Sequence, residues 1–158
     1  MFKKIVVALK FTQASRFALE KAITLARANE AELHIFHALD YRLKALDKRD
    51  PKLLELRKEI KHSIETEVKP LIDGFKNLTF GILPADPALE VCKIARYVNA
   101  DLIILGSHQR LKKTCLGRLD YIGITILENA PCPVMLVPHS NELRRELRLE
   151  TLNLGINN

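Results

Sequence analysis

The sequence has few of the residues that mark specialised folds and sites. Its 158 residues include three cysteines (Cys92, Cys115 and Cys132), no tryptophan and only 6% aromatic residues. An odd number of cysteines without Cys-x-x-Cys spacing indicates neither a disulfide framework nor a zinc site. A reducing compartment fits this cysteine usage best, so we expect a cytoplasmic protein.

Long hydrophobic runs are also missing. No apolar stretch approaches the roughly 18 residues that are needed to span a bilayer. The run at residues 5–9 follows two lysines, but it breaks at Lys10 and lacks a small-residue cleavage pattern, so it indicates a first strand and not a signal peptide. We therefore expect a soluble protein with no membrane partner.

The charge excess is moderate and dispersed. The 25 lysines and arginines against 19 acidic residues give a net charge of +6, which can attract nucleic acid or acidic lipid. The basic residues are scattered through segments rich in glutamate, so nucleic acid is not an expected partner. A hydrophobic content of 47% is typical of one globular domain with a real core.

Strand and helix patterns alternate along the chain. Short apolar runs predict strands, and apolar residues at helical spacing predict the segments between them as helices. The expected strands are 3–9, 32–39, 78–83, 101–106 and 132–137. The expected helices begin after Thr12 or Ser15, at Lys52, after Asp86 and near residue 118, the last ending at about 129. This order predicts an α/β fold with a parallel sheet, right-handed crossovers and helices on both faces.

Two helices carry more specific expectations. The first should bury Ser15, Ala18, Leu19, Ala22, Ile23 and Ala26 on one face. The long helix from Lys52 presents an apolar stripe that ends near Phe75, and Pro70 predicts a kink or an early end because it lacks an N–H group.

Several sequence pieces together resemble the universal stress protein family over about residues 1–138. These pieces are Lys-Lys-Ile-Val-Val-Ala-Leu at 3–9, Ala14-Ser15 and Ala18-Leu19, His37 at the end of the second strand, Ala-Asp-Leu-Ile-Ile-Leu-Gly-Ser-His at 100–108, and Cys-Pro-Val at 132–134. The resemblance implies a Rossmann-like, adenine nucleotide alpha hydrolase-like sheet of strand order 3-2-1-4-5, a homodimer and a role in stress response. In one branch of the family it also implies ATP between the ends of strands one and four, the switch point of such sheets. Residues 139–158 form a C-terminal extension, for which a helix and an extended arm both fit. Either this extension wraps the partner subunit as an arm, or it is a disordered tail.

The ATP-binding pattern of the family is altered in this chain. Members that bind ATP resemble Gly-x-x-Gly, nine residues and Gly-Ser/Thr, with an aspartate just after strand one. Here Gly106 matches, but Gln109 replaces the second glycine, seven residues instead of nine precede Gly117, and Arg118 replaces the hydroxyl residue. Lys10 takes the place of the aspartate. Carried over by position, the altered nucleotide site comprises Leu9, Lys10, Ala38, Leu105, Gly106, His108, Gln109, Gly117, Arg118 and Leu119.

These replacements predict a degenerate site with no cofactor. A side chain at 109 restricts the backbone where the pattern uses glycine, and Lys10 removes an acceptor worth roughly 1 kcal/mol. We expect Lys10 to plug the empty site. The alternative is that Lys10, Arg118 and the basic residues at 110–113 converge on the crevice and hold ATP or another phosphorylated ligand.

The sequence offers no recognisable catalytic or metal site. No Ser-His-acid arrangement or carboxylate pair falls at a strand end, although slow ATP hydrolysis is left open. The histidines near strand ends, His34, His37 and His108, have no other ligand at metal spacing and are interpreted as structural. Cys92 and Cys132 are interpreted as packing residues, and a redox role for Cys115 beside lysines is an alternative hypothesis.

The fifth strand is the better-supported functional surface. Val134, Met135, Leu136 and Val137 are all apolar, and the implied strand order puts them at an edge of the sheet, where unpaired backbone groups invite association. Two hypotheses follow. The first is a non-enzymatic homodimer, joined through this strand, that acts through an unknown protein partner. The second is a nucleotide- or phosphate-binding module that uses the loop between Gly106 and Gly117.

Overall fold

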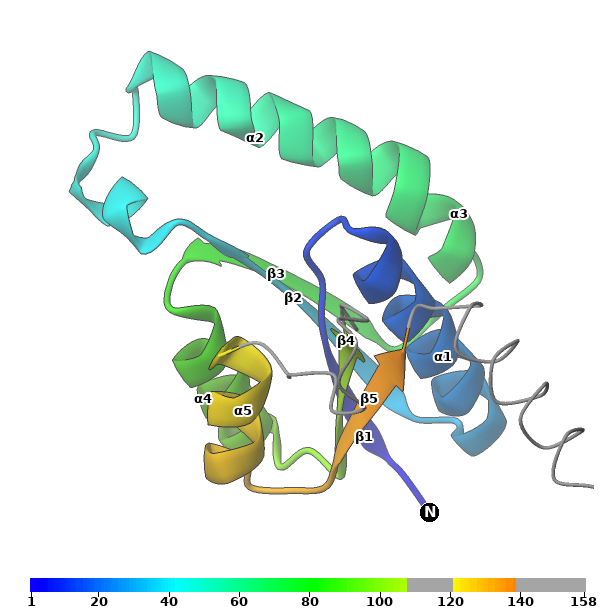
Figure 1. The fold of residues 1–158 in the computed structure, drawn as a ribbon. Helices are drawn as coiled ribbons and strands as arrows, with labels where there is room; N and C mark the ends of the chain where they lie inside the picture. Colours follow the sequence, from blue (N-terminus) through cyan, green and yellow to red (C-terminus); the bar gives the residue numbers. More distant parts are fainter. Residues whose placement is uncertain (108–120, 139–158) are drawn as a thin grey trace, which may run out of the picture.

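A computed structural model describes residues 1–107 and 121–138, and its centre is a five-stranded sheet (Figure 1). All strand pairs are parallel, in the order β3-β2-β1-β4-β5. The strands are β1 (Lys4–Ala8), β2 (Glu32–Leu39), β3 (Leu78–Pro84), β4 (Leu102–Ser107) and β5 (Val134–Pro138). The expected α/β fold and strand order are confirmed.

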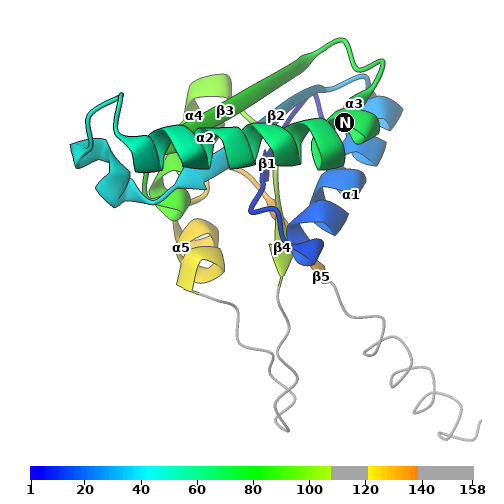
Figure 2. The same ribbon diagram turned by 90° about the horizontal axis from the view of Figure 1, so that it is seen from above.

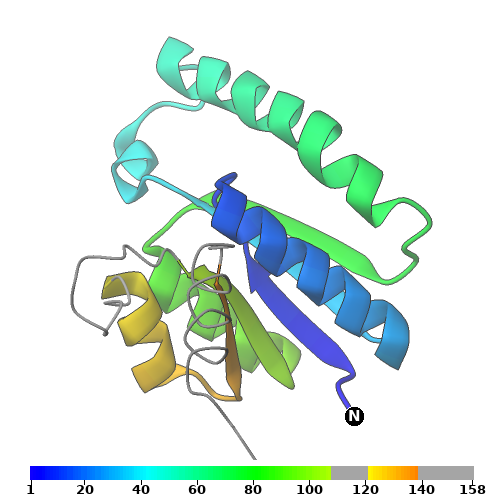
Figure 3. The ribbon, with the colours of Figure 1, turned by 45° about the vertical axis from the view of Figure 1, so that its right-hand side comes forward.

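Helices cover both faces of this sheet. Figures 1 and 3 show α4 and α5 together on one side and α1 on the other. Figure 2 shows α2 lengthwise, continuing into α3. The helical elements are α1 (Gln13–Asn29), the 3₁₀ turn η1 (Tyr41–Ala45), α2 (Pro51–Ser63), the π-helical turn η2 (Ile64–Val68), α3 (Lys69–Ile72), α4 (Pro87–Val98) and α5 (Tyr121–Asn129).

The central strand β1 divides the core into two layers. Ile5, Val6 and Val7 are all 0% exposed, as expected for a strand covered on both faces. Since successive side chains point to opposite faces, Ile5 and Val7 join the cluster under α1, whereas Val6 joins the cluster under α4 and α5. All six residues predicted for the inner face of α1 are buried.

Three helix starts follow from capping chemistry. Thr12 caps α1 in a reciprocal arrangement with Ser15, which decides between the two expected caps. Asp50 and Asp86 each accept a first-turn backbone N–H, and each precedes a proline at the first helical position. The start of the helix expected near residue 118 lies outside the described residues.

The irregularity expected at Pro70 is present, but the helix does not end there. The backbone N–H of Lys69 bonds to the Ile64 carbonyl, one residue further back than in an α-helix, and the chain then continues through α3 to Ile72. Because Pro70 has no N–H to donate, the preceding turn widens, as π-helical turns in helices do.

The strand boundaries differ from expectation by one or two residues. The fourth strand begins at Leu102 and not at Asp101, although the Asp101 backbone N–H donates to the Lys4 carbonyl. The Asp101 carboxylate accepts the backbone N–H groups of Lys3 and Lys4 at the start of the sheet. The fifth strand begins at Val134 and not at residue 132, since Pro133 has no N–H for the ladder and only its carbonyl accepts a bond, from Ile103. No helix within the described residues is long and apolar enough to cross a membrane.

Candidate functional site: a cavity at the carboxyl ends of β1, β2 and β4

A cavity of about 440 Å³ lies where β1, β2 and β4 end. The last residues of these strands, the first turn of α4 and the inner face of α5 enclose it. The central strand β1 has β2 on one side and β4 on the other, so the cavity occupies the switch point of the sheet. Its volume lies within the range of small-molecule sites in proteins.

The wall of the cavity is largely aliphatic. The apolar side chains come from the strand ends and from both helices of the α4–α5 layer, and they are Ala8, Leu9, Phe36, Ala38, Leu39, Ala85, Val91, Leu105, Ile122, Ile126 and Leu136. A wall of this kind accommodates a flat apolar group and offers few polar contacts to orient it.

Polar residues line the cavity from three neighbouring segments. Lys10 and Thr12 lie in the turn between β1 and α1, and Ser15 lies in the first turn of α1. Asp40 and Arg42 come from the segment after β2, and Ser107 ends β4. The polar groups of the cavity therefore lie at the ends of the strands and in the segments that follow them.

The turn between β1 and α1 is fixed by Ser15. Its Oγ, in a side chain only 4% exposed, accepts the backbone N–H groups of Lys10 at 3.2 Å and Thr12 at 3.1 Å and donates to the Thr12 carbonyl at 2.9 Å. Phe11 between them has a φ of 55°, in the left-handed region. One buried hydroxyl thus stabilises a strained turn at the cavity rim.

His37 supports the same turn from β2. Its Nδ1 lies 2.8 Å from the Leu9 carbonyl oxygen, and its ring packs edge-on against Phe11 with the ring centres 4.8 Å apart. Burial lowers the pKa of His37, and the bond to Leu9 opposes that shift only in part. The histidine is structural, as the sequence predicted.

Asp40 and Arg42 form an ion pair at the rim. The Arg42 Nε lies 3.0 Å from both carboxylate oxygens of Asp40, and Arg42 Nη2 donates to Oδ2. These bonds lower the pKa of Asp40 to about 2. The carboxylate is therefore ionised and occupied.

The structure brings together those predicted site residues that it describes. Leu9, Lys10, Ala38, Leu105 and Gly106 all line the cavity. The other predicted positions, His108, Gln109, Gly117, Arg118 and Leu119, lie outside the described residues, as do Cys115 and the extension from 139 to 158.

Two sequence interpretations change. Lys10 does not plug the site, because it is exposed at the rim of an open cavity. Gly106 has a packing role independent of any nucleotide: a Cβ there would lie 2.5 Å from the carbonyl carbon and oxygen of Ala14 and 2.6 Å from the Ser15 nitrogen. The glycine lets α1 approach β4.

Sequence reasoning missed the segment after β2. Asp40 and Arg42 are not among the site residues expected from the sequence, yet both line the cavity. The available signal was their position directly after a strand of a parallel sheet, the edge where ligand sites form.

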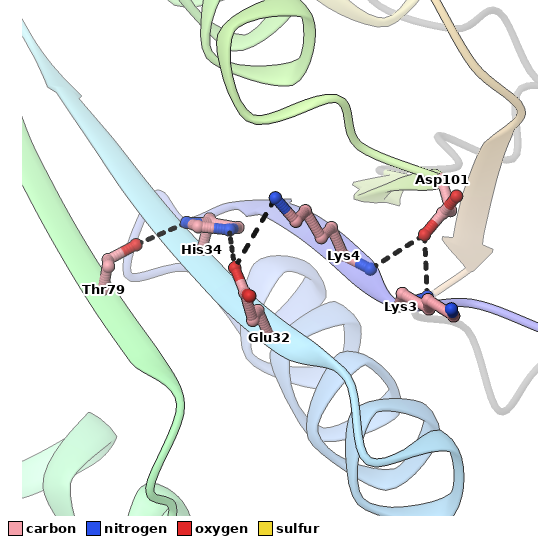
Figure 4. Close-up of polar contacts among 6 residues, drawn as sticks. All are labelled: Lys3, Lys4, Glu32, His34, Thr79 and Asp101. Atoms are coloured by element: carbon pink, nitrogen blue, oxygen red, sulfur yellow. Dashed lines mark hydrogen bonds and ion pairs between the residues drawn. The ribbon is translucent and has the colours of Figure 1, made fainter.

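The opposite end of the sheet holds polar contacts with no cavity role (Figure 4). His34 Nδ1 lies 2.6 Å from Thr79 Oγ1, and its Nε2 lies 3.6 Å from Glu32, which also pairs with Lys4. Within residues 1–107 and 121–138 no cluster of three or more potential ligands could hold a metal ion. Burial raises the pKa of both Cys92 and Cys132, which fits packing roles.

Comparison with known proteins agrees with this architecture. A family model described as the universal stress protein family matches residues 1–138. A putative universal stress protein of Staphylococcus epidermidis is 27% identical, with 86% of this chain and 84% of the relative covered. Universal stress protein MJ0577 of Methanocaldococcus jannaschii is 26% identical, with 89% and 98% covered.

Solved structures have the same fold. That of MJ0577 is 28% identical with a TM-score of 0.71 and covers 89% of this chain and 99% of its own. A universal stress protein in complex with cAMP is 20% identical, with a TM-score of 0.65 and 88% and 99% covered. An Arabidopsis thaliana family member with AMP bound is 17% identical, with a TM-score of 0.61 and 89% and 94% covered. Because the family model spans most of the sequence, this chain belongs to the universal stress protein family.

Proposed function

We propose that this chain binds an adenine nucleotide in the cavity at the ends of β1, β2 and β4. The observation that carries the proposal is the cavity itself: about 440 Å³, apolar inside and polar at its rim, at the switch point of the sheet. Family members solved with AMP and with cAMP support the choice of ligand class.

The division between wall and rim suggests how such a ligand lies. The purine packs among the aliphatic side chains, and the phosphate points to the rim, where Lys10 and Arg42 supply positive charge. The altered pattern at Gln109 and Arg118 removes the sequence basis for a preference for triphosphates. The proposal therefore covers adenine nucleotides as a class.

The proposed role is binding and not catalysis. The carboxylate that lines the described cavity, Asp40, is occupied by Arg42 and so is a poor general base. We propose that nucleotide occupancy is read by a protein partner during stress response. A cytoplasmic location stays a prediction from cysteine usage.

Calorimetric titration of the full chain with adenosine, AMP and Mg-ATP tests the proposal. We expect saturable binding in the micromolar range, and Ala38→Phe, which fills the cavity, should abolish it. The matched control is Ala45→Phe at an exposed position that does not line the cavity. Absence of saturation at millimolar ligand, or equal loss in both variants, would contradict the proposal.

We also propose a homodimer through β5. Among the described strands β5 is an edge and pairs with β4 alone, and Val134, Met135 and Leu136 are only partly buried. A second copy would extend the sheet across a two-fold axis and cover this edge. Sedimentation equilibrium at micromolar concentration should give the mass of two subunits; the mass of one would refute this proposal.

A further inference from the structure

The segment after β2 brings opposite charges to the rim of the cavity. Asp40 caps the 3₁₀ turn η1, and Asp40, Tyr41 and Arg42 all line the cavity. Among the described residues that line it, Lys10 and Arg42 are the cationic ones. We infer that Arg42, oriented by Asp40, is the residue with which this chain recognises the phosphate of its nucleotide; the inference rests on the proposed function.

The ion pair leaves part of the guanidinium available. Arginine carries five N–H donors in a planar fork. Asp40 takes the Nε donor and one from Nη2, and the described residues provide no other hydrogen-bond acceptor for the Arg42 side chain. With its side chain 77% exposed, Arg42 can offer the remaining donors to an oxyanion.

Asp40 also restricts how Arg42 can move. Besides the side-chain bonds, the Asp40 Oδ1 accepts the Arg42 backbone N–H at 3.0 Å, so both the turn and the guanidinium are held by one carboxylate. A long side chain that is already ordered loses less entropy when it binds. The arrangement suits the two-point recognition of a phosphate for which arginine is better shaped than lysine.

A phosphate contact from Arg42 would compensate for the altered ATP-binding pattern of this chain. The second glycine and the hydroxyl residue of the family pattern are absent at Gln109 and Arg118. Arg42 brings charge and directed donors from the neighbouring strand end instead. Asp40 is then a positioning residue, since it acts on the phosphate only through Arg42.

Comparison of AMP with adenosine isolates the phosphate contact. We expect Arg42→Gln to lower the affinity for AMP about tenfold, which corresponds to loss of one charge-assisted contact. The affinity for adenosine, which has no phosphate, should change less than about twofold. Arg42→Lys should recover part of the AMP affinity. The matched control, Lys69→Gln, removes a cation from another exposed ion pair, with Glu65, away from the cavity.

Asp40→Asn distinguishes positioning from simple charge. If Asp40 only neutralised the charge of Arg42, removing the negative charge of Asp40 would increase the affinity for AMP. We expect weaker AMP binding, because the guanidinium is no longer held. Tighter binding would overturn the positioning role.

The experiment distinguishes failure of the proposed nucleotide binding from failure of the role assigned to Arg42. If the wild-type chain binds neither adenosine nor AMP, the proposed function fails and this inference with it. If it binds both, and Arg42→Gln leaves the ratio of the two affinities unchanged, the nucleotide site stands and the role of Arg42 is refuted.

Discussion

The Nδ1 atom of His37 lies 2.8 Å from the carbonyl oxygen of Leu9 and thereby ties the end of β2 to the end of β1. Both strands stop at the rim of the cavity, and the turn that carries Lys10 starts at this contact. The geometry of the site therefore depends on a titratable group that does not itself line it.

The lowered pKa of His37 predicts stability that depends on pH. Below its ordinary value of 6.5 the unfolded chain binds a proton that the folded chain resists, so the free energy of unfolding should fall as the pH drops below 6.5. His37→Gln should reduce that slope by at most about 1.4 kcal/mol per pH unit. Urea unfolding between pH 8 and pH 5 measures it.

A second histidine serves as the control. His62 is exposed on α2, so His62→Gln is the matched substitution of a histidine away from the cavity. An equal slope in wild type and His37→Gln would show that the buried His37 makes no contribution to the pH response.

Gly106→Ala should destabilise the fold, since the added Cβ meets the backbone of Ala14 and Ser15 at 2.5 to 2.6 Å. We expect a loss of roughly 1–3 kcal/mol, the usual cost of overpacking. Gly81→Ala is the control, because its Cβ would make only an ordinary contact with Phe36 at 3.5 Å. Similar melting temperatures for the two variants would contradict the packing role of Gly106.

Ser15→Ala removes the acceptor of two backbone N–H groups in the turn before α1. Leaving those donors unpaired should cost about 1–3 kcal/mol and weaken ligand binding at the rim. Thr24→Ala, which removes an exposed hydroxyl bonded to the Glu20 carbonyl, should cost far less. Chemical denaturation of the two variants measures the loss in each. Equal free energies of unfolding would contradict the stabilisation of this turn by the Ser15 hydroxyl.

Asp101 should stabilise the chain above its titration range. Its carboxylate accepts the backbone N–H groups of Lys3 at 2.7 Å and Lys4 at 2.9 Å, which lowers its pKa below the ordinary 3.8 (Figure 4). The stabilisation is therefore present above pH 3.8 and is lost as the pH falls through the lower folded value.

Asp101→Ala should accordingly lower the melting temperature at pH 7, and its difference from wild type should shrink as the pH is lowered from 3.8 towards 2. The control is Asp73→Ala, whose side chain is exposed beyond α3. A loss at pH 2 as large as that at pH 7 would refute a role for the ionised carboxylate.

Much of the fold was predictable because it depends on local patterns. The apolar run at Ile5–Val7, the caps at Thr12 and Asp86 and the inner face of α1 each follow from rules that act over a few residues. The strand order came from resemblance, since alternation of strands and helices alone permits other arrangements.

The site was only partly predictable because it depends on contacts between distant segments. The packing role of Gly106 appears only when α1 lies against β4, and an exposed Lys10 cannot be distinguished from a plug without the shape of the turn. Asp40 and Arg42 face a cavity whose other walls come from α4, α5 and β4. No local sequence pattern specifies that these segments, which are distant in the sequence, line one cavity.

Nuclear magnetic resonance titration of the full chain with AMP tests the central claim most directly. The account predicts saturable shifts in the methyl groups of Ala38, Leu105 and Ile126, which line the cavity, with little change at Leu54 on the exposed side of α2. Shifts that do not saturate at millimolar AMP, or that cluster away from these three side chains, would contradict it.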